Sequence, residues 1–218
     1  MPRLLAFASL VLLLGSRAPA GQPRPPAAEQ GSQIGRAIGP VKIETFGLWN
    51  ALKDLAQQKQ FVIGLVGNQR DMEVSFKVNL ESATIGEVLD ALIRQAPAFS
   101  WQEEPGGTFR VTSKSLVSDL ADLQVSYPGA ANLTREQFWR HLEVSQPVST
   151  WLNTHSCKRW DIFNGHEFSD RNDPMEIRGT TESFSDLLDD VAGKSGADFW
   201  GIMRRIDDGH CSVQITVW

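Results

Sequence analysis

The sequence has no excess of basic residues, and this limits its partners. Its 218 residues carry a net charge of −5, with 21 Lys and Arg against 26 Asp and Glu. Because nucleic-acid binding normally needs a basic surface, this balance argues against a nucleic-acid partner. Charged residues make up 22% and hydrophobic residues 41% of the chain. That composition excludes a mainly disordered chain and a membrane protein with many spans.

Familiar catalytic motifs are also missing. The chain has no G-x-S-x-G elbow, no P-loop, no G-x-G-x-x-G and no H-E-x-x-H. The acidic residues Asp186, Asp189 and Asp190 fall on an expected helix, where a solvated polar face is the simplest interpretation. We interpret the acidic residues at 170–173 as a turn, because the glycine and final glutamate of a calcium loop are absent. The sequence therefore predicts no enzyme and no cofactor.

A long hydrophobic run occurs only at the N-terminus. Arg3 precedes the apolar residues 4–14, and a small-x-small sequence, Ala-Pro-Ala, follows at 18–20. This order is typical of a secretory signal peptide. The run is shorter than the roughly 20 residues that span a bilayer. We therefore predict a signal peptide over residues 1–20, export to the periplasm or medium, and no transmembrane segment in the mature chain.

The rest of the chain divides into two similar halves. Residues 21–40 are rich in Pro and Gly, and we interpret them as a flexible leader. Beyond them, residues 76–101 overlay residues 175–200 without a gap, and the hydrophobic pattern coincides. In this overlay an aspartate matches an aspartate (Asp90 and Asp189) and a tryptophan matches a tryptophan (Trp101 and Trp200). The overlay predicts two units, at 41–114 and 133–218, joined by a connector at 115–132.

Local patterns predict the elements of each unit. Residues 74–80 alternate between polar and apolar, as in a half-buried strand. Thr84 and Glu87 have the spacing of a capping box at a helix start, and Thr134 and Gln137 repeat it. Each half reads as helix, strand, strand, helix, strand, strand. We therefore expect an α+β fold of two tandem small units, each a short sheet packed by two helices.

The first unit resembles a known family. Its strand at 74–80, its helix of the form Thr-x-x-Glu-x-Leu after Thr84, and its strand pair at 99–112 resemble the short N-terminal domain of secretins and TonB-dependent receptors. The resemblance covers residues 41–114, and residues 134–218 match as a diverged copy. It implies a periplasmic interaction module that has no catalytic residues. No secretin core or outer-membrane barrel follows in this sequence, so a pore or receptor role is not expected.

The chain has two cysteines, Cys157 and Cys211. Exported proteins favour disulfides, and the overlay puts both residues at strand starts of one unit. A bond closing this loop would stabilise the fold by about 4 kcal/mol on the chain-entropy model. The alternative is a metal site formed by His155, Cys157, His210 and Cys211, although their spacing matches no usual zinc pattern. A free thiol paired with a histidine is a third, less favoured option.

Tryptophan is unusually frequent, with seven residues against one tyrosine. Trp49, Trp101 and Trp200 fall on apolar faces and are expected in the core. The others that the pattern does not place inside are candidate contact residues for a partner: Trp139, Trp151, Trp160 and Trp218. Trp218 ends an expected strand whose edge could pair with another chain.

These observations favour an exported, non-enzymatic interaction module with a protein partner in the bacterial cell envelope, associated with a secretion or uptake assembly. The alternative is a secreted metal- or ligand-binding protein that uses the His and Cys residues around Cys157 and Cys211. A hydrolase is the third hypothesis, and a cleft that gathers His141 or His155 with a carboxylate would favour it.

Overall fold

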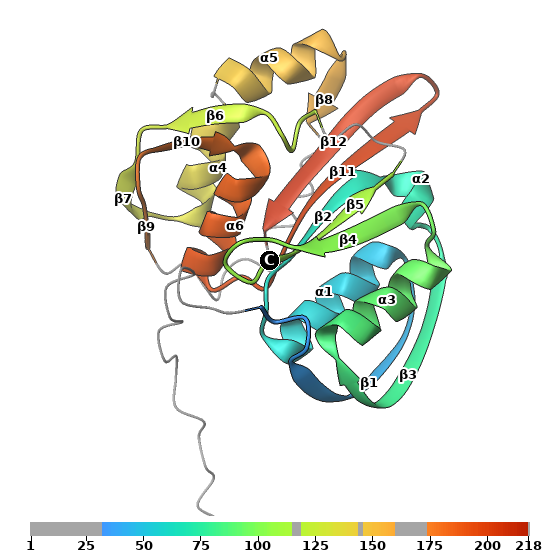
Figure 1. Cartoon of the computed structure of the whole chain (residues 1–218). Helices are drawn as coiled ribbons and strands as arrows, with labels where there is room; N and C mark the ends of the chain where they lie inside the picture. The colour runs from blue at the N-terminus through green and yellow to red at the C-terminus, as the bar shows by residue number, and fades with distance from the viewer. Residues whose placement is uncertain (1–31, 115–118, 144–145, 160–173, 218) are drawn as a thin grey trace, which may run out of the picture.

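The computed structural model describes residues 32–114, 119–143, 146–159 and 174–217 (Figure 1). The predicted signal peptide and most of the predicted leader lie outside these ranges. No helix within them is long and apolar enough to cross a membrane. The elements in chain order are β1 (Ala37–Phe46), α1 (Leu48–Lys59), β2 (Ile63–Asn68), α2 (Gln69–Met72), β3 (Ser75–Thr84), α3 (Ile85–Gln95), β4 (Phe99–Glu103), β5 (Phe109–Ser113), β6 (Gln124–Tyr127), β7 (Ala130–Leu133), α4 (Arg135–Glu143), α5 (Gln146–Thr154), β8 (Cys157–Arg159), β9 (Met175–Ile177), β10 (Thr180–Ser183), α6 (Phe184–Ser195), β11 (Phe199–Asp207) and β12 (His210–Val217).

Both halves of the chain contribute to one six-stranded mixed sheet with the order β4-β5-β2-β11-β12-β8. The first three strands come from the first half and the last three from the second. The halves meet where β2 and β11 pair in parallel, with Ile63 opposite Phe199. The remaining strands form two-stranded sheets, β1 with β3, β6 with β10, and β7 with β9.

The predicted fold class, two α+β units with separate small sheets, is therefore wrong, and the chain is a mixed α/β protein with a shared central sheet. The first half also opens with a strand, β1, that the sequence pattern had not shown. The physical reason lies in β2, where all residues but the last are buried. Such a strand needs cover on both faces and partners on both edges, and the second half supplies part of each.

The two halves cover opposite faces of the shared sheet. Ile63 and Phe199 pack into the core that contains α1 and α3, whereas Trp200 and Ile202 pack into the core that contains α4 and α6. Side chains alternate between the faces of a strand, so neighbouring residues of β11 serve different cores. In Figure 1, α1 and α3 lie between the sheet and the β1–β3 ribbon.

The predicted helix capping boxes were correct, unlike the predicted arrangement of the sheets. Thr84 accepts a hydrogen bond from the backbone N–H of Glu87, and the Glu87 carboxylate accepts one from the backbone N–H of Thr84, which confirms the capping box. Thr134 and Gln137 form the second box in the same way. The segment expected to be a connector, residues 115–132, contains β6 and most of β7.

Candidate functional site

The junction between the halves is built on two glycines and two tryptophans. A Cβ atom on Gly64 of β2 would lie 2.2 Å from the indole of Trp200, and one on Gly201 of β11 would lie 2.4 Å from the indole of Trp49. Each ring therefore occupies the space that a side chain on the facing glycine would fill. Trp49 also meets the ring of Phe199 edge-on, with centroids 5.0 Å apart.

A charged cluster closes this junction on the Trp200 side. Arg110 of β5 donates from Nη2 to Asp189 Oδ2 at 2.6 Å and to Asp186 Oδ1 at 3.0 Å, both on α6. Its Nη1 lies 3.1 Å from Glu104 Oε1. The indole Nε1 of Trp200 donates to Asp189 Oδ1 at 2.5 Å. Arg110 therefore joins the first half to the helix of the second.

The cluster is mostly shielded from water. The side chains of Arg110 and Asp189 are 13% and 16% exposed, whereas that of Asp186 is 51% exposed. Burial raises the pKa of Asp189 to about 6, although Arg110 and the Trp200 indole both act to lower it. Partial burial raises the pKa of Asp186, but hydrogen bonds from Ser183 and Arg110 outweigh this and lower it overall. Three carboxylates thus share one guanidinium.

This cluster corrects the solvated-face interpretation for Asp189, whereas the side chain of Asp186 is 51% exposed. Asp189 is largely shielded at the junction, because the Arg110 side chain extends from β5 of the other half to bond it. For the Trp200 partner of Asp189, the sequence offered one signal, because the overlay matches Trp200 with Trp101 as it matches Asp189 with Asp90. It offered none for Arg110, which lies far from Asp189 along the chain and meets it only through the shared sheet.

The matched residues of the first half form the same pair. Trp101 of β4 donates from Nε1 to Asp90 Oδ1 of α3 at 2.8 Å. The surroundings differ, because Asp90 is exposed and Trp101 is only partly buried. Among the described residues, Asp90 has no arginine or lysine partner. The first-half pair therefore lies at the surface, while the second-half pair lies at the junction.

Trp101 also lies on an edge strand of the central sheet. β4 is the first strand in the sheet order and pairs only with β5 among the described strands. The backbone N–H of Lys114 donates to the Ala98 carbonyl, and the backbone N–H of Glu104 donates to the Thr108 carbonyl, so these two positions face β5. Since antiparallel pairing alternates, the backbone groups of Trp101 and Glu103 point away from β5. No described strand pairs with them on that side, although the Glu103 carboxylate accepts hydrogen bonds from the Ser32 hydroxyl and the Gln33 backbone N–H. An added strand could use these backbone groups.

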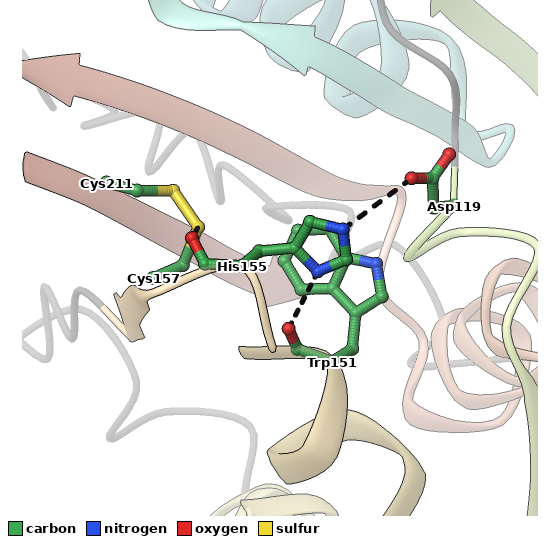
Figure 2. The surroundings of a disulfide bond; sticks show 5 residues. All are labelled: Asp119, Trp151, His155, Cys157 and Cys211. Carbon is green, nitrogen blue, oxygen red and sulfur yellow. Dashed lines mark hydrogen bonds and ion pairs between the residues drawn. A yellow bond between two sulfur atoms is a disulfide. The ribbon is translucent and has the colours of Figure 1, made fainter. Parts of the chain in front are cut away.

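The predicted disulfide is present (Figure 2). Cys157 of β8 and Cys211 of β12 are register partners in parallel strands, with Cα atoms 4.4 Å apart, and their sulfurs are bonded. The bond fixes the short strand β8 to the sheet. In the disulfide neither sulfur is a thiolate, so the metal-ligand set proposed for His155, Cys157, His210 and Cys211 loses both sulfur ligands. No group of three His, Cys, Asp or Glu residues in the described ranges is arranged to hold a metal ion.

His155 lies beside the disulfide, stacked on Trp151 (Figure 2). The two rings have centroids 4.2 Å apart, and His155 Nδ1 lies 2.8 Å from the Trp151 carbonyl oxygen. Its Nε2 lies 3.9 Å from Asp119 Oδ2. The carboxylate that a hydrolase would need is thus present, but no described hydroxyl or thiol is bonded to either ring nitrogen. His141 instead lies beside a phenol, with Nδ1 3.4 Å from the Tyr127 hydroxyl.

The candidate contact tryptophans do not form one surface within the described residues. Trp151 is partly buried against the second core. Trp160, Trp218 and the side chain of Trp139 lie outside what the structure describes. The strand that precedes Trp218, β12, lies between β11 and β8, but β8 pairs only with Cys211–Val213, so residues 214–217 have no partner on that side among the described strands. The outer strand that the sequence reasoning missed as a contact site is β4.

Comparison of the chain with protein-family models, curated proteins and solved structures finds no match.

Proposed function

We propose that this protein is an exported, non-enzymatic interaction module of the bacterial cell envelope, associated with a secretion or uptake assembly. The observation that carries the proposal is the β4 edge, which has no further strand among the described residues, beside the pair of exposed Asp90 and partly buried Trp101. Strand addition to such an edge is a common mode of protein recognition, because main-chain hydrogen bonds give affinity and flanking side chains give specificity.

The disulfide supports the predicted compartment. A bond between Cys157 and Cys211 persists in oxidising environments such as the periplasm or the medium, and is uncommon in the cytosol. The interaction role is compatible with the export prediction, because an exported chain would present the β4 edge to other envelope proteins.

Capture from the native envelope tests the proposal. The tagged mature chain is cross-linked in its own cell envelope, and the retained proteins are identified by mass spectrometry. We expect one or a few envelope proteins to be enriched over a bait of similar charge and size. The absence of any specifically retained protein would contradict the interaction role.

A further inference from the structure

We propose that the Trp101–Asp90 pair and the β4 edge bind an arginine-bearing extended segment of a partner protein. This inference rests on the proposed function and adds to it the chemistry of the partner. The arginine would contact the Asp90 carboxylate and lie over the Trp101 ring while its segment pairs with the open edge of β4.

The molecule contains an occupied example of this site. In the second half, the Trp200–Asp189 pair receives Arg110 from the first half, with the guanidinium carbon 5.9 Å from the Trp200 ring centroid. The strand that carries Trp200, β11, has β2 added along its edge in parallel. The adjacent strand places Gly64 opposite Trp200, and the arginine comes from β5, the next strand beyond β2, where Arg110 lies opposite Gly64.

The first half presents the same parts without the neighbour. Trp101 and Asp90 match Trp200 and Asp189 in the sequence overlay, and each pair is joined by an indole-to-carboxylate hydrogen bond. Asp90 is exposed, and its only hydrogen-bond partner among the described residues is the Trp101 indole, which leaves its second carboxylate oxygen open. The edge of β4 has no added strand within the described part of the chain.

The site favours arginine over lysine. A guanidinium is planar, so it can bond a carboxylate and stack on an aromatic ring at once, whereas an ammonium ion is a compact, strongly hydrated charge. The nearby cations Arg36 and Arg94 are exposed and are not bonded to Asp90 in the described structure. Recognition is therefore expected to depend on an arginine that the partner supplies.

A peptide titration monitored by NMR tests the inference. The probe is an acetylated octapeptide of alternating Thr and Val with one central arginine, and two matched peptides carry citrulline or lysine in its place. We expect the arginine peptide to shift the Trp101 indole and the Trp101 and Glu103 amides. Because exposed charge pairs are weak, it should bind about fivefold more tightly than the citrulline peptide.

Two substitutions test whether the preference for the arginine peptide depends on Asp90. Asp90→Asn keeps an oxygen that accepts the indole hydrogen bond but removes the charge, and should abolish the preference for arginine. Glu81→Gln removes an exposed charge from β3 and should leave the preference intact. Failure of all three peptides to shift β4, or an unchanged preference in the Asp90→Asn protein, would overturn the inference.

Capture from the envelope separates this failure from failure of the proposed function. Specific envelope proteins retained equally by the wild-type and Asp90→Asn chains would leave the interaction role standing and remove the arginine site. Loss of retention by Asp90→Asn but not by Glu81→Gln would support both.

Discussion

The two tryptophan–aspartate pairs show how one arrangement serves two purposes. In the second half, Asp189 lies at the junction with its side chain 16% exposed, bonded to Trp200 and Arg110. In the first half, Asp90 is exposed and bonded only to Trp101 among the described residues. The difference arises because the shared sheet continues past β11 to β2 and β5, whereas β4 is its outer strand among the described residues. A pair that is structural in one half is thus a candidate contact site in the other.

Removal of Arg110 should have the largest effect on this comparison. Arg110→Ala leaves Asp189 buried without its cation and breaks the link between halves, which should lower the free energy of unfolding by about 3 kcal/mol. Urea unfolding at neutral pH, without reductant, measures it. The control is Arg94→Ala, an exposed arginine on α3, which should change stability by less than about 0.5 kcal/mol. Equal, small effects of both substitutions would mean that Arg110 does not hold the junction.

The pair at the junction should also make the stability of the protein depend on pH. Burial raises the pKa of Asp189 from an ordinary value of 3.8 to about 6. A carboxyl group with a raised folded-state pKa contributes stability below its unfolded pKa and loses it as pH rises through the folded pKa. Between pH 4 and 7 the wild type should therefore lose up to about 3 kcal/mol relative to Asp189→Asn.

Unfolding of both proteins at several pH values measures this difference. The lowered pKa of Asp186 acts in a separate window, because its contribution is present above about 3.8 and lost only as pH falls through the lowered value. A stability difference between wild type and Asp189→Asn that stays constant from pH 4 to 7 would contradict the assignment.

A methyl group at Gly64 tests the packing of the buried pair. Because a Cβ atom there would lie 2.2 Å from Trp200, Gly64→Ala should displace the indole and cost about 2 kcal/mol. Gly193 of α6 is the matched control, since a Cβ atom there has no neighbour within 4 Å. Gly193→Ala should instead add about 1 kcal/mol through helix propensity. A neutral Gly64→Ala protein would show that the contact of Trp200 with β2 is dispensable.

The exposed pair should matter least for stability. Asp90→Asn preserves an acceptor for the Trp101 indole in an exposed setting, so the free energy of unfolding should change by less than about 0.5 kcal/mol. Thermal unfolding of the Asp90→Asn and wild-type chains checks this value. A cost as large as that of Arg110→Ala would mean that Asp90 has a structural role and would end the contrast between the halves.

Local chemistry made the helix starts and the disulfide predictable, but not the pairing of strands. Thr84 and Thr134 each cap a helix together with a residue three positions later. Such a short spacing can be recognised in a single sequence. The pairing of Ile63 with Phe199 depends on distant segments, and the burial of β2 on both faces became visible only with the shared sheet. The overlay matched Asp90 with Asp189, yet it gave no sign that Arg110 would bury one of them and leave the other exposed.

Amide hydrogen exchange of β4 in the complex with a captured envelope protein tests the central claim most directly. If the edge of β4 is the docking site, the outward amides of Trp101 and Glu103 should exchange freely in the isolated chain and become protected on binding, while the amides of β2 stay protected in both states. Protection elsewhere, with Trp101 and Glu103 unchanged, would contradict the claim.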